Sequence, residues 1–398
     1  MLEGKKIVLG ISGSIAAYKS IVLLRLLIKA GADVQCVLTP AAKDFVSPLV
    51  LSTLSKHPVV SQLQEGEEWS NHVALGRWAD LMILAPASCN TLAKMAHGLC
   101  DNVLLAVYLS ATCPVLVVPA MDEDMWHHPA TRANLQTLAS YGNNVMPTQH
   151  GELASGLVGM GRMAEPEDIL VFATEHFFRQ SFLAGKKALV TAGPTHEPID
   201  PVRFIGNRSS GKMGLALAEA LYLAGAEVQL VAGPMERNTA FKGIQQHKVN
   251  TAAEMFQAVE KLWPHQDLGI FNAAVADFTP ATLAAEKIKK SQDHMSISLV
   301  PTTDILAACG HAKQAQQFIM GFALETENES ANATLKLNNK NADVIVLNAL
   351  RHEGVGFGAD TNRVTLFTKG GESLAWDLMD KQTLAQKLVW WLGEKLKK

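Results

Sequence analysis

The sequence is poor in cysteine, in charge of one sign and in long apolar runs, and each shortage excludes a class of protein. Its five cysteines are scattered along 398 residues, and no two of them have the C-x-x-C spacing of zinc ribbons or redox motifs. We therefore expect reduced thiols in the core of a cytosolic protein, not a disulfide or zinc framework. A net charge of −3 gives no reason to expect a nucleic acid or an anionic membrane as partner.

Membrane-spanning and secretory segments are not expected either. No stretch approaches the roughly 20 consecutive apolar residues that a spanning helix needs. Lys5 and Lys6 precede an apolar run, as in a signal peptide. Lys19 and Arg25 interrupt that run, however, and no small-residue cleavage site follows it. We expect a soluble, cytoplasmic protein.

The most informative feature that is present is an internal repeat. Residues 4–39 and 185–232 each run from two lysines through an apolar run, a Gly/Ser-rich loop and a helical stretch to A-G-A-[DE]-V-Q and a second apolar run. Each stretch predicts a strand–loop–helix unit whose helix N-terminus offers N–H groups and a positive dipole to a phosphate. The second copy is 13 residues longer, since Gly4 corresponds to Gly185 whereas Gly31 corresponds to Gly225. We expect special chemistry in this insert, around residues 200–210.

Alternating apolar runs and helical patterns predict an α/β fold with two doubly wound, Rossmann-like domains. Expected strands of the first half are 7–10, 34–38, 81–85, 115–118 and 144–146, with helices at 15–30, 131–141 and 166–180. Expected strands of the second half are 188–192, 228–232, 268–272, 318–323 and 344–347, with a hairpin near 363–368 and helices at 328–343 and 381–396. The Gly-rich stretch 147–166 predicts a mobile lid. Trp390 and Trp391 of the last helix are expected to pack on their domain.

The first Gly/Ser-rich loop does not fit a nicotinamide dinucleotide. Gly10-x-x-Gly13 lacks the G-x-G-x-x-G spacing, and the second strand ends in Thr39 where an acid would bind a ribose hydroxyl. Hydroxyl groups on Ser12, Ser14 and Thr39 suit a mononucleotide phosphate such as that of FMN. The pattern alone leaves FMN and another phosphate ligand equally open.

The second loop is close to a nucleotide-binding P-loop without matching it. Residues 206–212 read G-x-x-x-x-G-K, but Met213 follows where a serine or threonine must reach Mg²⁺. The loop also lies about a dozen residues after its strand. These differences argue against a kinase or motor and favour an anion cradle.

Three further patterns have both a structural and a functional interpretation. His72 lies at helical spacing from Leu75 and Trp78, so it is either a core histidine or a catalytic base. The acidic and histidine residues of 122–128 lack ordered ligand spacing, which favours a solvated turn over a metal site. The basic tract 287–290 is either a charged surface or a phosphate contact, because it follows a loop after an expected strand.

Taken together, these motifs resemble the bacterial bifunctional proteins of coenzyme A biosynthesis along nearly the whole chain. In that family a phosphopantothenoylcysteine decarboxylase is joined to a phosphopantothenate–cysteine ligase. The decarboxylase half is matched by GSIAAYK, His72 with Leu75, APAS-x-N-T-x-A-K, PAM-x-x-x-MW and G-x-GRM. The ligase half is matched by ID-PVR-x-I-x-N-x-SSGKMG, AAVAD, KIKK, GF-A-x-E-T and K-N-A-D.

The resemblance implies a flavodoxin-like, FMN-dependent decarboxylase domain over residues 1–180. FMN oxidises the cysteinyl thiol side, the resulting thioaldehyde loses carbon dioxide, and the reduced flavin returns the electrons. His72 would be the base near the flavin, and the loop at 119–121 would hold the substrate carboxylate. The implied FMN-binding residues are Ser12, Gly13, Ser14, Thr39, Ser88, Asn90, Thr91 and Met121.

The resemblance also implies a nucleotide-binding ligase domain over residues 185–398. There the pantothenate carboxylate attacks CTP, with Mg²⁺, to give an acyl-cytidylate, and the amine of cysteine displaces CMP. Lys287, Lys336 and Lys340 would surround the triphosphate, and Asn207 would polarise the acyl group or hold the intermediate. The other implied CTP-binding residues are Phe271, Asn272, Ala273, Asp277, Thr303, Asp304, Ile305, Leu306 and Phe322. Asp277 is also the expected metal ligand.

Two positions depart from the family pattern of the decarboxylase half. Asp122 stands where most members have asparagine, and Ser155 stands where the commoner A-C-G lid has its proton-donating cysteine. A serine hydroxyl is a far weaker acid than a thiol. Two interpretations follow: a subgroup in which Asp122 is the acid, or a ligase whose flavin half binds FMN only as a scaffold or regulator.

The expected partners are small molecules and further copies of the chain. The substrates implied by the resemblance are 4'-phosphopantothenate, L-cysteine and CTP. The family suggests a homo-oligomer in which trimeric flavin units and ligase dimers build a dodecamer. No residue of the sequence specifies that assembly.

Overall fold

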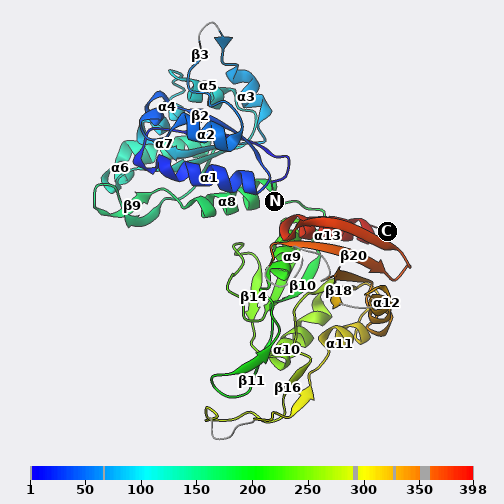
Figure 1. Ribbon diagram of the computed structural model, residues 1–398. Helices are drawn as coiled ribbons and strands as arrows, with labels where there is room; N and C mark the ends of the chain where they lie inside the picture. The colour runs from blue at the N-terminus through cyan, green and yellow to red at the C-terminus, as the bar shows by residue number, and fades with distance from the viewer. Residues whose placement is uncertain (1, 66–67, 290–294, 326–328, 350–358, 398) are drawn as a thin grey trace. The chain divides into compact units, whose positions relative to one another are not determined.

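The structure, a computed structural model, describes residues 2–65, 68–289, 295–325, 329–349 and 359–397. The chain forms two units, Met1–Phe178 and Arg179–Lys398, called here the N-terminal and the C-terminal unit (Figure 1). Each unit is built around its own parallel sheet, so each is described by itself. No helix of the described residues is long and apolar enough to cross a bilayer.

The N-terminal unit has a five-stranded sheet in the order β2-β1-β5-β6-β7. Its strands are β1 (Lys6–Ile11), β2 (Asp33–Leu38), β5 (Leu81–Ala87), β6 (Val115–Pro119) and β7 (Asn144–Val145). All neighbours are parallel, and the central strands β5 and β6 are buried throughout, as expected for a sheet covered on both faces. This order is that of flavodoxin-like folds, with the topological switch point between β1 and β5.

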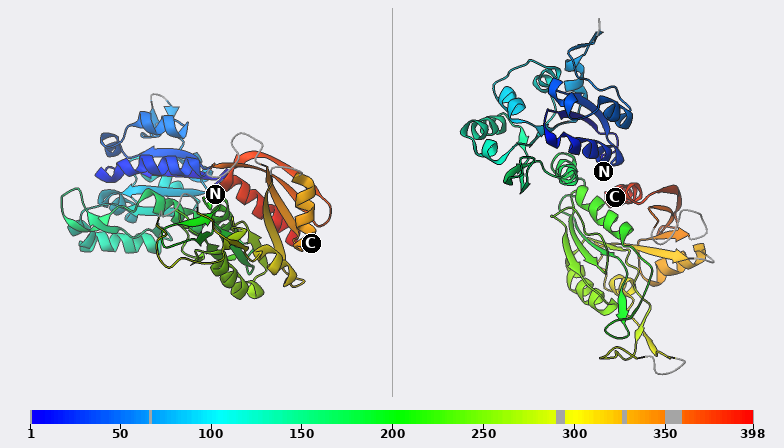
Figure 2. Two further views of the ribbon diagram at one scale, coloured as in Figure 1. Left: turned by 60° about the horizontal axis from the view of Figure 1, so that its bottom comes forward. Right: turned by 60° about the vertical axis from the view of Figure 1, so that its left-hand side comes forward.

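Helices cover both faces of this sheet (Figures 1 and 2). One face carries α1 (Tyr18–Lys29), α2 (Pro48–Ser55) and α8 (Pro166–Phe178). The other carries α3 (His72–Trp78), α4 (Cys89–Ala96), α5 (Val103–Ser110) and α7 (Pro129–Ser140). The short elements are η1 (Ile15–Ala17), η2 (Pro40–Asp44), β3 (Gln64–Glu65), β4 (Glu68–Trp69) and α6 (Glu123–His127).

The expected Gly-rich lid contains regular structure. Residues Gln149–Glu152 (β8) pair antiparallel with Val158–Arg162 (β9) to form a hairpin. Two of the glycines lie where β9 passes close to other atoms, Gly159 against the Glu123 carboxylate and Gly161 against the Met121 carbonyl. Glycine is needed at these two positions because other atoms come too close for a side chain. The glycines therefore do not follow the alternation of a strand, and the sequence of this stretch has no strand period.

The C-terminal unit has an eight-stranded sheet in the order β14-β13-β10-β15-β18-β19-β20-β21. Its first six strands are parallel: β10 (Lys187–Ala192), β13 (Glu227–Ala232), β14 (Gln245–Lys248), β15 (Leu268–Phe271), β18 (Phe318–Glu325) and β19 (Val344–Ala349). An antiparallel hairpin, β20 (Thr361–Thr368) and β21 (Ser373–Asp380), extends one edge. The parallel part has the classic Rossmann order, with its switch point between β10 and β15.

The helices of this unit are α9 (Lys212–Leu223), α10 (Ala252–Leu262), α11 (Ile305–His311), α12 (Glu329–Asn339) and α13 (Lys381–Leu396), with a short η3 (Trp263–His265). A common core joins α10, α11 and α12, whereas α9 packs against α13 (Figures 1 and 2). The loop that carries the 13-residue insert contains a hairpin of β11 (His196–Pro198) and β12 (Phe204–Gly206). A second small hairpin joins β16 (Phe278–Pro280) and β17 (Leu299–Pro301).

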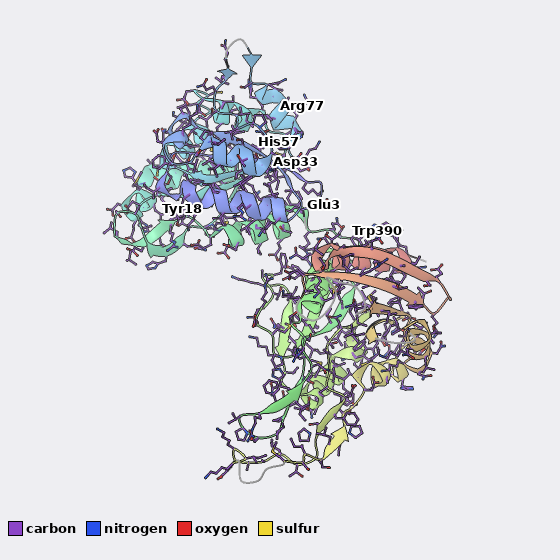
Figure 3. All side chains as sticks on the ribbon, viewed as in Figure 1. Glu3, Tyr18, Asp33, His57, Arg77 and Trp390 are labelled. Carbon is purple, nitrogen blue, oxygen red and sulfur yellow. The ribbon has the colours of Figure 1, made fainter. Side chains whose placement is uncertain are left out.

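The predicted fold class, two doubly wound Rossmann-like domains, is confirmed. The expectation for the last helix is half wrong: Trp391 is buried, but Trp390 is 61% exposed and projects from α13 (Figure 3). The two tryptophans are adjacent, so a helix turns them about 100° apart and only one can face its domain. Sequence patterns also missed β14, because its residues QQHK carry no apolar signal.

Candidate functional sites

The first candidate site lies at the switch point of the N-terminal sheet, where the loops after β1 and β5 meet. Ser12 is buried, and its Oγ donates a hydrogen bond to the Pro86 carbonyl over 2.7 Å. The same Oγ accepts one from the Ser88 backbone N–H over 2.9 Å. Parallel strands end at one edge of the sheet, so this link fixes the two predicted cofactor loops relative to each other.

The loop after β2 approaches the same edge. A Cβ on Gly13 would lie 2.9 Å from the Cβ of Ala41, so only glycine fits there. Thr39 is 6% exposed, and its Oγ1 has no hydrogen-bond partner among the described residues. Buried hydroxyl groups are nearly always satisfied by protein, water or ligand. A ligand oxygen at this hydroxyl fits the predicted mononucleotide phosphate.

The loop after β5 brings together three more of the predicted cofactor residues. Ser88 caps α4, with its Oγ 3.5 Å from the Thr91 N–H and 3.3 Å from the Thr91 Oγ1. The Cys89 sulfur lies 3.3 Å from the Met121 sulfur, which connects this loop to the one after β6. Asn90 is exposed on the first turn of the helix. Another predicted cofactor residue, Ser14, lies in the loop after β1, where it caps η1 by accepting a hydrogen bond from the Ala16 N–H.

The β8–β9 hairpin is fastened to the loop after β6. The Met121 N–H donates to the Gly161 carbonyl over 3.1 Å. Asp122 caps α6, its Oδ1 accepting a hydrogen bond of 2.8 Å from the Glu123 N–H. Lys19, which is 5% exposed, anchors the end of the hairpin by donating to the Met163 carbonyl and to Glu165, both over 2.9 Å. That hydrogen bond lowers the pKa of Glu165.

The three residues expected to catalyse decarboxylation come from separate elements. His72 is half-buried in the first turn of α3, whose Leu75 and Trp78 pack on the core. Asp122 begins α6. Ser155 is exposed in the turn between β8 and β9, where its Oγ accepts a hydrogen bond of 3.4 Å from the Leu157 N–H. Ser155 therefore belongs to a structured turn at the tip of the hairpin.

The second candidate site is a cavity of about 660 Å³ at the switch point of the C-terminal sheet. Its walls come from the ends of β10, β15, β18 and β19 and from the first turns of α9 and α11. Predicted residues that line it are Asn207, Phe271, Asn272, Ala273, Asp277, Thr303, Asp304, Ile305, Leu306, Phe322, Lys336 and Lys340. The structure thus gathers residues from four distant parts of the chain into one pocket.

Lys287 is the predicted residue that does not line this cavity. It is exposed, on the segment between β16 and β17. The buried Asp200 carboxylate fastens that segment to the β11–β12 hairpin: it accepts hydrogen bonds from the Ile288 N–H over 3.2 Å and from the Arg203 guanidinium. The basic tract is therefore held by the insert, and its last residue, Lys290, lies outside the described residues.

Asn207 lines the cavity and is also bonded to the protein backbone. Its side-chain NH₂ donates to the backbone carbonyls of Val275 and Ala274, over 2.9 and 3.3 Å. Only the nitrogen of the amide can donate to these acceptors, so the hydrogen bonds define its orientation. Asn207 therefore ties the insert to the loop after β15.

One wall of the cavity carries an ion-paired group of charged residues. Lys340 donates to the Asp304 carboxylate over 2.5 Å, and Asp304 also caps α11 by accepting from the Ala307 N–H. Burial opposes ionisation of Asp304, but the hydrogen bond from Lys340 and the charges of Lys340 and Lys336 outweigh it and lower its pKa. This wall presents cations to an anionic ligand such as a triphosphate.

Two further lysines, Lys212 and Lys381, line the cavity although the sequence did not predict them there. Lys212, which begins α9, donates to the Asp360 carboxylate over 2.6 Å. Lys381, which begins α13, is 9% exposed and donates to the Ala359 carbonyl. The G-x-x-x-x-G-K motif could have pointed to Lys212 as a ligand-binding residue. No motif marks Lys381, which is simply the first residue of the last amphipathic helix.

Metal ligands are sparse at both sites. No group of three or more His, Cys, Asp or Glu side chains suited to a metal ion occurs within the described ranges. The residues of 122–128 lie in the short helix α6 and its flanking positions. Asp277, the expected ligand, is an exposed carboxylate in the cavity wall.

Comparison with known proteins identifies the family. A flavoprotein family model matches residues 1–178, and the model of the DNA/pantothenate metabolism flavoprotein C-terminal domain matches residues 183–395. The chain is 42% identical over 394 residues to the coenzyme A biosynthesis bifunctional protein of Bacillus subtilis (strain 168), covering 98% of this chain and 97% of that protein.

Two other matches are informative in different ways. A cysteine/cysteine sulfinic acid decarboxylase of an unknown prokaryotic organism is 47% identical over 350 residues, which is 86% of this chain and 98% of that protein. The solved C-terminal domain of a coenzyme A biosynthesis bifunctional protein is 38% identical, covers 55% of this chain and 99% of its own, and has a TM-score of 0.47. With both domain models matched in order and a relative matched over nearly its full length, the chain belongs to the family of coenzyme A biosynthesis bifunctional proteins.

Proposed function

We propose that this chain catalyses two successive steps of coenzyme A biosynthesis. The C-terminal unit joins cysteine to 4'-phosphopantothenate at the expense of CTP, through an acyl-cytidylate. The N-terminal unit then decarboxylates 4'-phosphopantothenoylcysteine to 4'-phosphopantetheine with FMN. The observation that carries the proposal is the C-terminal cavity, which gathers the nucleotide-binding residues expected for this family at the switch point of a Rossmann-type sheet.

The N-terminal switch point supports FMN as the cofactor. The buried Thr39 hydroxyl without a protein partner fits a phosphate oxygen, and the linked loops of Ser12 and Ser88 would hold the phosphate and the ring. When bound, FMN supplies the two-electron oxidation that makes loss of carbon dioxide possible. His72 would take the proton during that step, and Asp122 would give a proton back at the end.

In the ligase cavity, Lys336 and Lys340 would neutralise the triphosphate of CTP while the carboxylate attacks. Charge neutralisation is the main contribution that a protein makes to such nucleotidyl transfer. Mg²⁺ commonly binds through one or two carboxylates together with substrate phosphates, so Asp277 alone can supply the protein ligand. Asn207, bound to the 274–275 carbonyls, would hold the loop that faces the acyl group.

A second candidate activity for the N-terminal unit is decarboxylation of free cysteine or of its sulfinic acid. The specific observation that favours it is the 47% identical relative of that name. Both substrates carry a carboxylate next to the carbon that bears the amine and sulfur-containing side chain. Supplying phosphopantothenoylcysteine and cysteine separately distinguishes the two activities.

Two variants test the division of labour between the units. In His72→Asn, release of carbon dioxide from phosphopantothenoylcysteine should stop while CTP-dependent release of CMP continues. In Lys340→Gln, CMP release should fall by about 10²-fold, as expected for loss of one transition-state contact, while decarboxylation is unchanged. Lys395→Gln is the matched control. Lys395 lies on α13, where it pairs with Glu372, and its substitution should change neither rate. Normal decarboxylation by His72→Asn would show that the N-terminal site is wrongly assigned.

A further inference from the structure

A loop of the C-terminal unit contacts the wall of the cavity from outside. This loop, residues 233–244, connects β13 to β14 and is called here the backing loop. The described residues that line the cavity come from other segments, among them 273–277 after β15 and 209–211 before α9. The backing loop can therefore affect a ligand only through the segments that it touches.

Three loops are stacked at this edge of the sheet, in the strand order β13-β10-β15. The Ala274 N–H, in the cavity wall after β15, donates to the Gly193 carbonyl after β10 over 2.9 Å. The Gly233 N–H of the backing loop donates to the Ala192 carbonyl, at the end of β10, also over 2.9 Å. A Cβ on Gly233 would lie 1.7 Å from the Pro194 carbonyl oxygen, so these two loops are in direct contact. Movement of the backing loop would thus reach the cavity wall.

Met235 is the side chain that joins the backing loop to two tight turns. A Cβ on Gly193 would lie 2.8 Å from the Met235 Cγ, and a Cβ on Gly211 would lie 1.9 Å from its Sδ. Both glycines have positive φ, +79° and +71°. The half-buried thioether therefore lies against the backbone of the turn after β10 and of the turn that begins α9. An unbranched, adaptable side chain suits such an irregular space.

The far end of the backing loop is fastened to α9. The Glu219 carboxylate accepts hydrogen bonds from the Thr239 hydroxyl over 3.3 Å and from the Ala240 N–H over 3.5 Å. Burial raises the pKa of Glu219, in agreement with a carboxylate enclosed beneath the loop. Phe241 is 1% exposed and packs against Tyr222 of α9, with ring centroids 5.6 Å apart. These contacts hold the segment that carries Met235 along the helix.

We propose that Met235 is a positioning residue of the ligase. By filling the space against Gly193 and Gly211, it keeps the cavity wall at 273–277 aligned with the start of α9, and Glu219 holds the loop that carries it. The inference rests on the proposed ligase function, because the aligned segments face the reacting groups. A displacement of about 1 Å in an active site can cost about 10²-fold in rate, so a side chain outside the cavity can affect the reaction.

The kinetic test compares Met235→Ala with Met235→Leu in the full-length, FMN-loaded protein. In Met235→Ala we expect kcat for CMP release to fall by about 10- to 100-fold while KM for CTP changes little, because misalignment affects reaction more than binding. Met235→Leu keeps the volume and should keep a rate close to that of the wild type. Decarboxylation of supplied 4'-phosphopantothenoylcysteine by the same protein is the internal control and should not change.

Glu219 provides an independent variant of the same loop. Glu219→Ala should slow ligation as Met235→Ala does, whereas Glu219→Gln keeps an acceptor for both donors and should not. The double variant with Met235→Ala should be no slower than the slower single variant, because both changes release one loop. Rate losses that multiply in the double variant would contradict a shared action through the loop.

Amide hydrogen exchange tests the support without any reaction. In ligand-free Met235→Ala, the Ala274 N–H should exchange about 10-fold faster or more, because exchange reports local opening. The amides of β15 should keep their protection. Wild-type exchange at Ala274, or a wild-type kcat with only a lower melting temperature, would overturn the proposal. Absence of CMP release from the wild type would instead contradict the proposed ligase, and exchange would still decide whether Met235 supports this wall. Glu219→Ala gives the same two readouts if Met235→Ala fails to fold.

Discussion

At the scale of single residues, Thr39 gives the sharpest test of the flavin site. Its hydroxyl is buried and has no hydrogen-bond partner in the described part of the chain, so the free protein gains nothing from it. Thr39→Val keeps the shape, and we expect the dissociation constant for FMN to rise by about 10- to 100-fold, through loss of a hydrogen bond to a charged oxygen. Fluorescence titration of the flavin-free protein measures this.

Stability provides the contrasting readout for the same variant. The melting temperature of flavin-free Thr39→Val should equal or exceed that of the wild type, because the substitution removes an unsatisfied hydroxyl. Thr53→Val is the matched control, since Thr53 lies on the exposed face of α2 and its hydroxyl donates a hydrogen bond to the Leu49 carbonyl. Unaltered FMN affinity in Thr39→Val would mean that the hydroxyl does not contact the cofactor.

The proton donor of the decarboxylase is the second residue-scale question. If Ser155 acts in place of a cysteine, Ser155→Cys should accelerate the final protonation by supplying a stronger acid. We favour Asp122, and therefore expect Ser155→Cys to change little and Asp122→Asn to slow product formation by about 10²-fold or more, the range for loss of a general acid. Rapid-quench analysis of the decarboxylation measures both rates. A large gain in Ser155→Cys would contradict this choice.

At the scale of elements, the insert between β10 and α9 acts through the Asp200 carboxylate. That carboxylate joins the β11–β12 hairpin to the segment that carries Lys287. Asp200→Asn and Lys287→Gln should therefore impair the same step: both should lower kcat/KM for CTP by about 10²-fold, the usual effect of a small displacement in an active site. Lys289→Gln, two residues away and also exposed, is the control. Normal ligation by Lys287→Gln would show that the tract is only a charged surface.

The effect of pH on this junction has a definite sign. Burial opposes ionisation of Asp200, but hydrogen bonds from Val202, Arg203 and Ile288 outweigh it and hold its pKa below the ordinary value of 3.8. A depressed carboxylate pKa contributes stability above the unfolded value, which is lost as the pH falls toward the folded value. The melting temperatures of wild type and Asp200→Asn should differ by a constant amount from pH 9 to about pH 5. The difference should shrink below about pH 4.

How much the sequence predicts depends on what kind of signal each element carries. Buried parallel strands are apolar runs, so the strands around both switch points could be located, and with them the loops of Ser12, Ser88 and Asp277. The β8–β9 hairpin could not, because its glycines mark close approaches to Glu123 and Met121. The position of Lys381 in the cavity could not be predicted either, because only the tertiary packing of α13 on α9 brings it there.

In the molecule as a whole, each unit has a parallel sheet with its candidate site at the switch point, but the two sheets have different strand orders. A flavodoxin-type order positions the cofactor loops, and a Rossmann-type order with an added antiparallel hairpin positions the nucleotide cavity. One residue of the added hairpin, Asn362 of β20, lines the cavity.

If the proposed function is right, one chain performs ligation and then decarboxylation. The most direct measurement incubates the purified protein with 4'-phosphopantothenate, L-cysteine, CTP and Mg²⁺, and follows CMP, carbon dioxide and the phosphorylated products by mass spectrometry. We expect a yellow protein that releases CMP and carbon dioxide in equal amounts and forms 4'-phosphopantetheine. CMP release with accumulation of 4'-phosphopantothenoylcysteine and no carbon dioxide would contradict it, as would carbon dioxide from free cysteine without any CTP-dependent product.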